Sequence, residues 1–292
     1  MSNSFSHALL GVDFSPATEP LLTCVPNLMS LGVEKMTLVY VMDIHYPRAP
    51  ETEHVSHYEK RLGELAATFE AQGVDVDTQV RVGDPAEEVL TAASEQHASV
   101  IVVGSHGQNV FGEALLGSVA STLTQKSTLP VLVLAVEAAG DPEDEQCRVV
   151  RSDLCTHILH PTDFSSVAER AYAYLTGLGR CPETITLLHV QDRKQATRIQ
   201  WANLEEYDRL DQARLQRLQA DLEGRSEAEV EIRLERGPTA RTVVKVAEEL
   251  EASLIVLGKQ GRGYLSEVML GSASRYVVRH ARVPVLLIPA PR

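Results

Sequence analysis

The amino-acid sequence contains the same pattern twice, and this repeat constrains the fold more than any other feature. When residues 98–134 are aligned with residues 252–288 without a gap, 13 of the 37 positions are identical. Shorter matches continue upstream: LLGVDFS at 9–15 parallels LHPTDFS at 159–165, and LVYVMD at 38–43 parallels LLHVQD at 187–192. A period of about 150 residues has the size of a whole domain rather than of a solenoid unit. The chain is therefore predicted to hold two copies of one domain.

The two copies are expected to meet at a short polar connection. Residues 140–145, GDPEDE, are polar and turn-prone, as linkers usually are. We therefore expect one domain over 1–137, a linker over 138–153 and a second domain over 154–292.

Short apolar runs alternate with helical patterns in both copies, which predicts an α/β fold. Continuous runs such as VIVV at 100–103 and LIVL at 254–257 are typical of strands buried on both faces of a parallel sheet. Strands that alternate with helices favour right-handed crossovers. Each copy is predicted to be a doubly wound domain with a five-stranded parallel sheet. The expected strands are His7–Val12, Met36–Val41, Val74–Val82, Val100–Val103 and Val131–Leu134, then Ile158–His160, Thr184–Val190, Glu229–Leu234, Leu254–Leu257 and Val285–Ile288.

Several helix starts are visible as capping residues followed by proline. Ser15-Pro16 suggests an N-cap with proline in the first helical position. Asp84-Pro85-Ala86-Glu87 suggests a cap, a proline and a glutamate that bonds back to the cap. Further helices are expected over Glu59–Gln72 and Ser118–Lys126, and near Ser166–Gly177, Leu204–Leu222, Thr239–Leu250 and Ser272–His280.

A glycine loop after the fourth strand carries the chemistry. Gly104-x-x-Gly107 is followed after nine residues by Gly117-Ser118, and Gly258-x-x-Gly261 is followed in the same way by Gly271-Ser272. Glycines let backbone N–H groups approach phosphate oxygens, and the N-terminus of the next helix adds free N–H groups and positive partial charge. A glycine needed only for a tight turn is the alternative. The recurrence of one spacing between a strand and a helix in both copies favours phosphate binding.

This glycine motif, with VD or TD after the first strand, resembles the ATP-binding universal stress proteins. The resemblance covers nearly the whole chain, with one family domain in each copy. It implies the adenine nucleotide alpha hydrolase-like fold, and it implies that nucleotide is bound, because family members with this motif bind ATP. The nucleotide-binding residues that it implies are Asp13, Val41, Gly104, Gly107, Gly117 and Ser118 in the first copy, and Asp163, Val190, Gly258, Gly261, Gly271 and Ser272 in the second. Asp13 and Asp163 have an alternative role, because an aspartate after a strand often caps the next helix.

The implied function is a nucleotide-dependent sensor or regulator of the stress response. The implied ligand is ATP, with ADP or AMP as alternatives, together with a divalent cation such as Mg²⁺ or Mn²⁺. Two other functions stay open: an interaction scaffold with a vestigial site, and a weak ATPase. No catalytic residues are assigned, and at most slow ATP hydrolysis or self-phosphorylation is expected. Expected partners are the second copy in a pseudo-dimer, through the apolar fifth strands, a possible homodimer and a regulatory protein.

The two glycine loops differ in charge. The second carries Lys259 and Arg262, where the first has Ser105 and neutral polar neighbours, so the second should suit a triphosphate better. The polar segments 51–60 and 195–207 follow the second strand of each copy and are expected to be loops that cover a ligand. Tyr207 is expected to pack or to close over adenine.

Composition excludes several classes of protein. The net charge of -13 argues against a phosphate-backbone grip on nucleic acid and against docking on anionic membranes. The four cysteines form no CxxC pair, which favours a reducing, cytoplasmic compartment. There is no GxxxxGK[ST] loop, no GxGxxG after the first strand and no GxSxG elbow. Cys155, His157, His160 and His189 lack standard metal-ligand spacing, so no metal site is assigned and buried, hydrogen-bonded side chains are expected instead.

Overall fold

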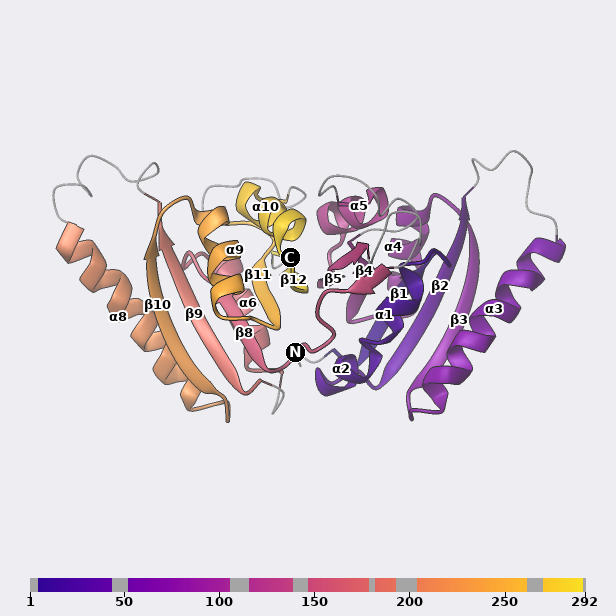
Figure 1. Ribbon diagram of the computed structural model, residues 1–292, viewed down its shortest axis with the longest axis horizontal. Helices are drawn as coiled ribbons and strands as arrows, with labels where there is room; N and C mark the ends of the chain where they lie inside the picture. Colours follow the sequence, from indigo (N-terminus) through magenta and orange to yellow (C-terminus); the bar gives the residue numbers. More distant parts are fainter. Residues whose placement is uncertain are drawn as a thin grey trace. The chain divides into compact units, whose positions relative to one another are not determined.

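The chain folds into two compact units, Ser4–Ser152 and one that contains Asp153–Arg292 (Figure 1). The computed structural model describes residues 5–43, 52–105, 116–138, 147–178, 182–192, 204–261 and 270–290. No helix in these ranges combines the length and the apolar character that crossing a bilayer requires.

The described part of the first unit is built on a five-stranded parallel sheet with the strand order β3-β2-β1-β4-β5. Figure 1 shows α3 and α4 on opposite faces of this sheet. The strands are β1 His7–Val12, β2 Lys35–Asp43, β3 Asp75–Gly83, β4 Val100–Gly104 and β5 Val131–Leu134, and the helices are α1 Thr18–Leu22, α2 Val25–Ser30, α3 Thr52–Glu70, α4 Pro85–Glu95 and α5 Ser118–Lys126.

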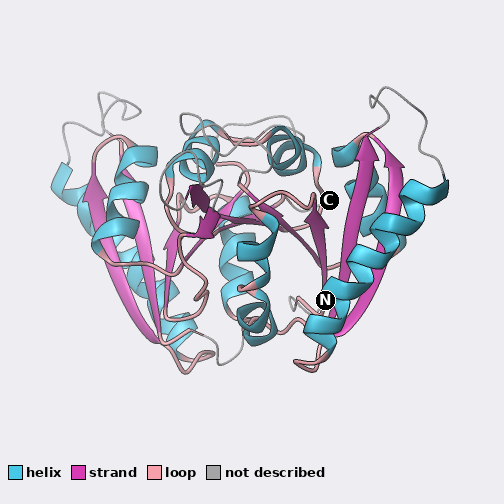
Figure 2. Cartoon of the chain, turned by 45° about the vertical axis from the view of Figure 1, so that its right-hand side comes forward, coloured by secondary structure: helices cyan, strands magenta, loops and turns pink. Residues whose placement is uncertain are grey.

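The second unit repeats this architecture in the order β10-β9-β8-β11-β12, again with parallel pairing throughout its described strands. Its strands are β8 His157–Pro161, β9 Thr184–Gln191, β10 Glu229–Arg236, β11 Leu254–Gly258 and β12 Val285–Ile288, and its helices are α6 Ser166–Leu175, α8 Leu204–Glu223, α9 Thr239–Glu249 and α10 Ser272–His280. The predicted duplicated, doubly wound α/β fold is confirmed (Figure 2).

Helices cover the sheets because the central strands are apolar on both faces. Every residue of β4, β5, β11 and β12 is buried. In the second unit α8 packs on β10 and β9, α6 packs on β11, and α9 packs on both α10 and β9. Burial of this kind contributes about 25 cal/mol per Å² of apolar surface, which makes these helix–sheet layers the main source of stability.

The connection between the units is partly structured. Strands β6 Val136–Ala138 and β7 Cys147–Val149 pair in an antiparallel ladder. The N–H of Val150 also donates to the carbonyl of Ala135 at 3.0 Å. Part of the segment expected to be a plain linker is therefore a small β-ribbon belonging to the first unit.

The first helix of the first copy differs from its prediction. Ser15 does not cap a helix that begins at Pro16; a turn lies there instead, and α1 begins at Thr18. The chain then forms two short helices, because Pro20 and Pro26 lack an N–H and their rings oppose a continuous helix. The second copy has no proline here, and Ser165 caps the ten-residue helix α6 by accepting from the N–H of Ala168.

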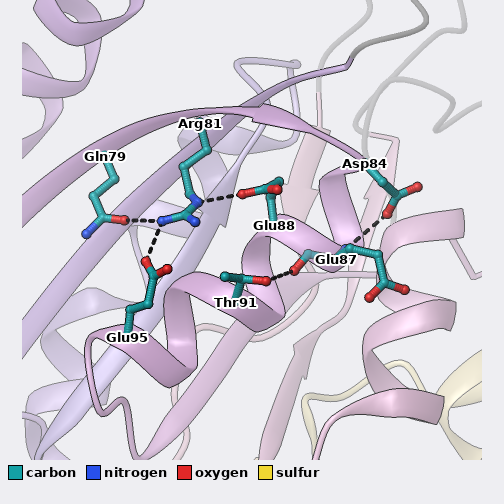
Figure 3. A network of polar contacts seen from close by, with 7 residues as sticks. All are labelled: Gln79, Arg81, Asp84, Glu87, Glu88, Thr91 and Glu95. Atoms are coloured by element: carbon teal, nitrogen blue, oxygen red, sulfur yellow. Dashed lines mark hydrogen bonds and ion pairs between the residues drawn. The ribbon is translucent and has the colours of Figure 1, made fainter.

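The prediction for the start of α4 is correct for the cap and wrong for the glutamate. Asp84 accepts from the backbone N–H groups of Ala86 and Glu87 at 3.0 Å (Figure 3). The Glu87 carboxylate does not return to the cap; it pairs with Lys126 of α5. This pair links the start of α4 to the end of α5.

Arg81 at the end of β3 fastens α4 to the edge of the sheet (Figure 3). Its Nε donates to Glu88 at 2.7 Å and its Nη1 to Glu95 at 2.8 Å, two turns further along the helix. The Glu88 side chain lies over Gly83, where an added Cβ would come within 2.7 Å of it, and Gly83 has φ +158°. Glycine is therefore required at this strand end.

The two described cysteine environments differ. Cys24 is free and buried, and burial raises the pKa of its thiol to about 11. Cys155 is disulfide-bonded. The reducing compartment was expected from the small number of cysteines and the lack of a CxxC pair, and it stays a prediction.

His160 is a fully buried imidazole in the middle of β8. Its Nδ1 bonds the carbonyl of Val256 at 2.8 Å, while its Nε2 is buried without a partner in the described part of the chain. Burial lowers the pKa of His160 to about 4, although the Val256 carbonyl acts in the opposite direction. The folded protein therefore holds this ring neutral.

Replacing His160 with leucine, the residue at the equivalent position 10, should reduce acid sensitivity. The unfolded chain takes up a proton at the ordinary pKa of 6.5 and the folded chain only near 4. Stability should therefore fall as the pH drops through this window, by roughly 3 kcal/mol in total. Urea unfolding at several pH values measures the slope. His160→Leu should flatten it and Leu10→His should steepen it; equal slopes in wild type and His160→Leu would contradict the prediction.

Candidate functional site

The second unit has a cavity of about 530 Å³ at the carboxyl ends of its strands. The strand order reverses next to β8, which lies between β9 and β11, and ligands of doubly wound domains bind at such a switch point. The volume lies within the range of small-molecule sites. The cavity is lined by Pro161, Thr162, Asp163, Ala168, Leu188, His189, Val190, Gln191, Asp192, Tyr207, Asp211, Arg236, Thr239, Val243, Leu257, Gly258, Gln260, Gly261, Gly271, Ser272, Ala273, Ser274 and Val277.

All six residues predicted for the second site lie around this cavity. Asp163 follows β8, and Val190 is the residue before the end of β9. Gly258 ends β11, and Gly271 and Ser272 begin α10. Segments that are far apart in the sequence thus converge because parallel strands all present their carboxyl ends at one edge of the sheet.

Asp163 has two roles in the local structure. Its Oδ1 accepts from the N–H of Ser165 at 3.0 Å, which supports the turn into α6. Its Oδ2 lies over Gly261, where an added Cβ would come within 2.7 Å. Between Asp163 and Ser165, Phe164 has φ 58°, a left-handed conformation that costs a bulky residue energy and that often marks functional sites.

The glycine loop closes on itself before α10. The N–H of Gly271 donates to the carbonyl of Lys259 at 2.9 Å, and the hydroxyl of Ser274 donates to the carbonyl of Gly258 at 2.9 Å. Residues 271–274, the cap and first turn of α10, line the cavity. N–H groups in a first helical turn have no partner within the helix, so this end of the cavity is suited to an anion.

The first copy places its predicted residues at equivalent positions. Asp13 follows β1 and accepts from the N–H of Ser15 at 3.0 Å, and Phe14 has φ 54°. Val41 lies in β2, two residues before its end, and Gly104 ends β4. The N–H of Gly117, the cap of α5, donates to the carbonyl of Ser105 at 2.8 Å, and Ser118 begins α5. Gly107 lies outside the described residues.

The expected cationic contribution of the second loop is wrong for Lys259. This side chain is only 4% exposed and is not among the residues that line the cavity. Burial lowers the pKa of Lys259 to about 8. Arg262 lies outside the described residues. The smaller Ser105 of the first copy is also buried and bonds the backbone of Val136 at 3.0 Å.

Sequence reasoning missed most of the polar side of the cavity and named from it only Tyr207, as a residue that packs or closes over adenine. Arg236 ends β10, His189 and Gln191 lie near the end of β9, and Tyr207 and Asp211 come from α8. Two signals could have found them: ligands of doubly wound domains bind at the carboxyl ends of strands, which include the end of β10, and Tyr207 and Asp211 are spaced to lie on one face of a helix. The segments 51–60 and 195–207, expected to be loops, contribute instead to the first turns of α3 and α8 where they are described.

His189 links β9 to α8 and to the turn after β8. Its Nδ1 lies 2.7 Å from the carbonyl of Thr162, and its Nε2 lies 3.4 Å from Oδ2 of Asp211. Gln191 donates to the same Oδ2 at 3.0 Å, and Arg214 reaches Oδ1 at 3.2 Å. Burial alone would raise the pKa of Asp211, but the hydrogen bonds from His189 and Gln191 and the charge of Arg214 hold it below its usual range.

The group of histidines near β8 and β9 is engaged in hydrogen bonds. His157 bonds the Thr186 hydroxyl at 2.8 Å, and His160 and His189 bond backbone carbonyls. Among the residues that the structure describes, no three His, Cys, Asp or Glu side chains gather into a possible metal site.

The fold and the cavity define a duplicated, doubly wound α/β domain with a ligand-sized pocket at the switch point of its second sheet. The model of the universal stress protein family matches residues 4–135 and 155–289. The chain belongs to this family.

Relatives and solved structures extend over the full tandem arrangement. A universal stress protein of Mycolicibacterium smegmatis is 27% identical over 96% of each chain, and one of Mycobacterium tuberculosis is 26% identical over 98% of this chain and 97% of its own. The crystal structure of a universal stress protein from Archaeoglobus fulgidus superimposes with a TM-score of 0.69 at 24% identity, over 100% of both chains. This last similarity shows the fold alone.

Gly261→Ala should destabilise the second unit, because the new Cβ would meet the Asp163 carboxylate. We expect a loss of about 1–3 kcal/mol in the free energy of unfolding, as for other overpacked sites. Gly63→Ala is the matched control, since a Cβ on this exposed glycine of α3 would meet nothing within 4 Å. That change should stabilise the protein by roughly 0.5–1 kcal/mol. Urea unfolding compares the two, and a Gly261→Ala protein as stable as wild type would contradict the prediction.

Proposed function

We propose that the chain is an ATP-binding regulator of the stress response that senses nucleotide through occupancy. The observation that carries the proposal is the convergence of Asp163, Gly258, Gly261, Gly271 and Ser272 on one cavity, with the first turn of α10 at its edge. Such a turn supplies N–H donors and positive partial charge to phosphate oxygens. Family membership and the doubled glycine motif support the same ligand class.

The cavity offers distinct environments for the parts of a nucleotide. Apolar side chains from β9 (Leu188 and Val190) and α9 (Val243) line it beside the polar groups, and a nucleobase needs such a surface. The carboxylate of Asp163 suits ribose hydroxyls, which donate hydrogen bonds. Ser272 and the α10 amides would face the phosphates. A divalent cation would be held by phosphate oxygens with few protein ligands, as Mg²⁺ usually is.

The described residues favour binding over catalysis. Both ring nitrogens of His189 face oxygen atoms of the protein, and Asp163 Oδ1 accepts from the backbone of Ser165. The His189 ring is therefore not poised to activate a water molecule. Occupancy would act by stabilising one conformational or partner-bound state, which requires only differential affinity.

The test is mass spectrometry of nucleotide released from protein purified without added nucleotide. Gly271→Asp should empty the second site, because a carboxylate would enter the anion end of the cavity, and Gly117→Asp should do the same in the first copy. Gly63→Asp, on the exposed face of α3, is the control for an added charge.

Each outcome has a clear meaning. ATP in the wild type and in Gly63→Asp, halved in each site variant and absent from the double variant, would support two working sites. Absence of nucleotide, together with no binding of added Mg-ATP by calorimetry, would overturn the proposal and leave an interaction scaffold. Steady phosphate release that disappears in the double variant would replace it with a weak ATPase.

A further inference from the structure

One side of each site is formed by a helix and the ends of two strands: α3 with β2 and β3 in the first copy, and α8 with β9 and β10 in the second. We call this side the wall, and the two copies build it from different side chains. Helix α3 and helix α8 correspond at a shift of 153 residues, since the buried Leu62 matches Leu215 and the buried Phe69 matches Leu222. On the strand side, β2 and β9 correspond at a shift of 149, and β3 and β10 at 154. These registers identify which side chains occupy equivalent places around each site.

In the first copy the wall is aromatic and apolar. The rings of Tyr40 in β2 and Tyr58 in α3 are 4.1 Å apart, and Phe14 lies 5.1 Å from Tyr40 and 5.7 Å from Tyr58. The Arg61 guanidinium lies 4.0 Å over the Phe14 ring. At the end of β3, Val82 is 42% exposed.

In the second copy the equivalent positions carry charged or ionisable groups. His189 replaces Tyr40, Asp211 replaces Tyr58, and their side chains are paired and largely buried, at 9% and 12% exposure. Arg236 replaces Val82 and pairs with Asp208, which replaces Val55. Only the contact between an arginine and a phenylalanine is shared by the two copies: the Arg214 guanidinium lies 5.3 Å from the centre of the Phe164 ring. The Phe164 ring in turn lies 4.6 Å from that of His189.

Both charged pairs join α8 to a strand end beside the cavity. Asp208 and Asp211 are one turn apart on α8, and they reach the ends of β10 and β9 respectively. Three of these four residues line the cavity: His189, Asp211 and Arg236. So does Tyr207, which precedes Asp208 on α8. Tyr207 therefore lies within a turn of both residues of α8 that make the pairs.

We propose that His189–Asp211 and Arg236–Asp208 form an ionic latch that holds α8 against the second site and makes ligand retention there depend on pH and salt. The first copy, with its aromatic wall, lacks this dependence. The proposal rests on the proposed nucleotide function for its ligand, but the latch itself is a property of the chain alone.

The sign of the pH effect follows from the geometry of His189. Because Nδ1 faces the Thr162 carbonyl, that nitrogen must carry a proton, and Nε2 can donate to Asp211 only when the ring is an imidazolium. The His189–Asp211 pair is therefore made when the ring is protonated, and the latch weakens when the ring loses that proton. The other charged groups around the ring are Asp208 and Arg214 from α8, Arg236 from β10, Asp192 after β9 and Asp163 after β8.

The test uses the full-length chain with the first site disabled by Gly117→Asp, and measures release of radiolabelled ATP from the second site. Release should be roughly two- to fivefold faster at about pH 8 than at about pH 6, and faster again in high salt, because salt screens the partly exposed Arg236–Asp208 pair. Asp211→Asn keeps the shape of the side chain but removes its charge, and should release ATP at the fast rate at both pH values. ATP itself also titrates, and it does so equally in both proteins. The difference between wild type and variant in how the release rate changes with pH therefore reports the protein alone.

Three further variants test the chemistry of the wall. The pair His189→Tyr and Asp211→Tyr copies the first site, and should retain ATP with little dependence on pH. Arg236→Lys keeps the charge and should preserve the salt response, whereas Arg236→Val should reduce it. An unchanged pH slope in Asp211→Asn, or the same slope in the first site when Gly271→Asp disables the second, would overturn the proposal.

A second measurement needs no ligand, so it separates failure of the latch from failure of the nucleotide function. Amide hydrogen exchange in the first turns of α8, referenced to α3 of the same molecule, should become relatively faster as the pH rises in wild type and should be fast at every pH in Asp211→Asn. If ATP does not bind but this exchange pattern appears, the latch stands and the ligand is wrong. If α8 exchanges like α3 at every pH, the latch is overturned whatever binds.

Discussion

The close approach of Gly261 to the Asp163 carboxylate is the contact on which the second pocket depends. It brings the loop after β11 against the turn after β8, the two neighbouring strands at the switch point. With the loop held there, the Gly271 amide reaches the Lys259 carbonyl, and α10 starts with its first turn at the cavity. A Cβ at position 261 would come within 2.7 Å of the Asp163 carboxylate and would force that side chain to move, so the glycine keeps the Asp163 end of the cavity in its present arrangement.

The duplication shows which constraints are strict. The positions where α3 and α8 pack on a sheet stay apolar in both copies, as Leu62 and Leu215 and also Phe69 and Leu222 do, because a buried cavity or an unpaired polar group in the core costs several kcal/mol. The Phe14 and Phe164 turns also keep their left-handed backbone, at φ 54° and 58°. The α8 wall lines a cavity rather than a sealed core, so the chemistry of this position was free to differ between the copies, aromatic in one and ionic in the other.

The architecture and half of the site were predictable because they depend on patterns local in sequence. Apolar runs located all ten strands of the two sheets, and the doubled glycine spacing located Gly258, Gly261 and Gly271. The burial of Lys259 was not predictable, since a lysine in a glycine loop gives no sign of which way it points. His189 and Asp211 were equally hidden: their meeting requires the register between β9 and α8, and that register is set by packing rather than by any local signal.

The earlier and later turns of α8 are held by different interactions, which explains how weak charge pairs could control a site. Leu215 and Leu222, both fully buried, anchor the later turns of the helix on the sheet, and each such side chain stabilises its position by about 1.5–3 kcal/mol. Asp208 and Asp211 act on the earlier turns; the Arg236–Asp208 pair is partly exposed and contributes about 1 kcal/mol or less, whereas His189 and Asp211 are largely buried. A contribution of that size cannot unfold the helix when it is lost. It is large enough to change how long the turns around Tyr207 stay against the cavity, and small enough for ordinary changes in pH and salt to reverse it.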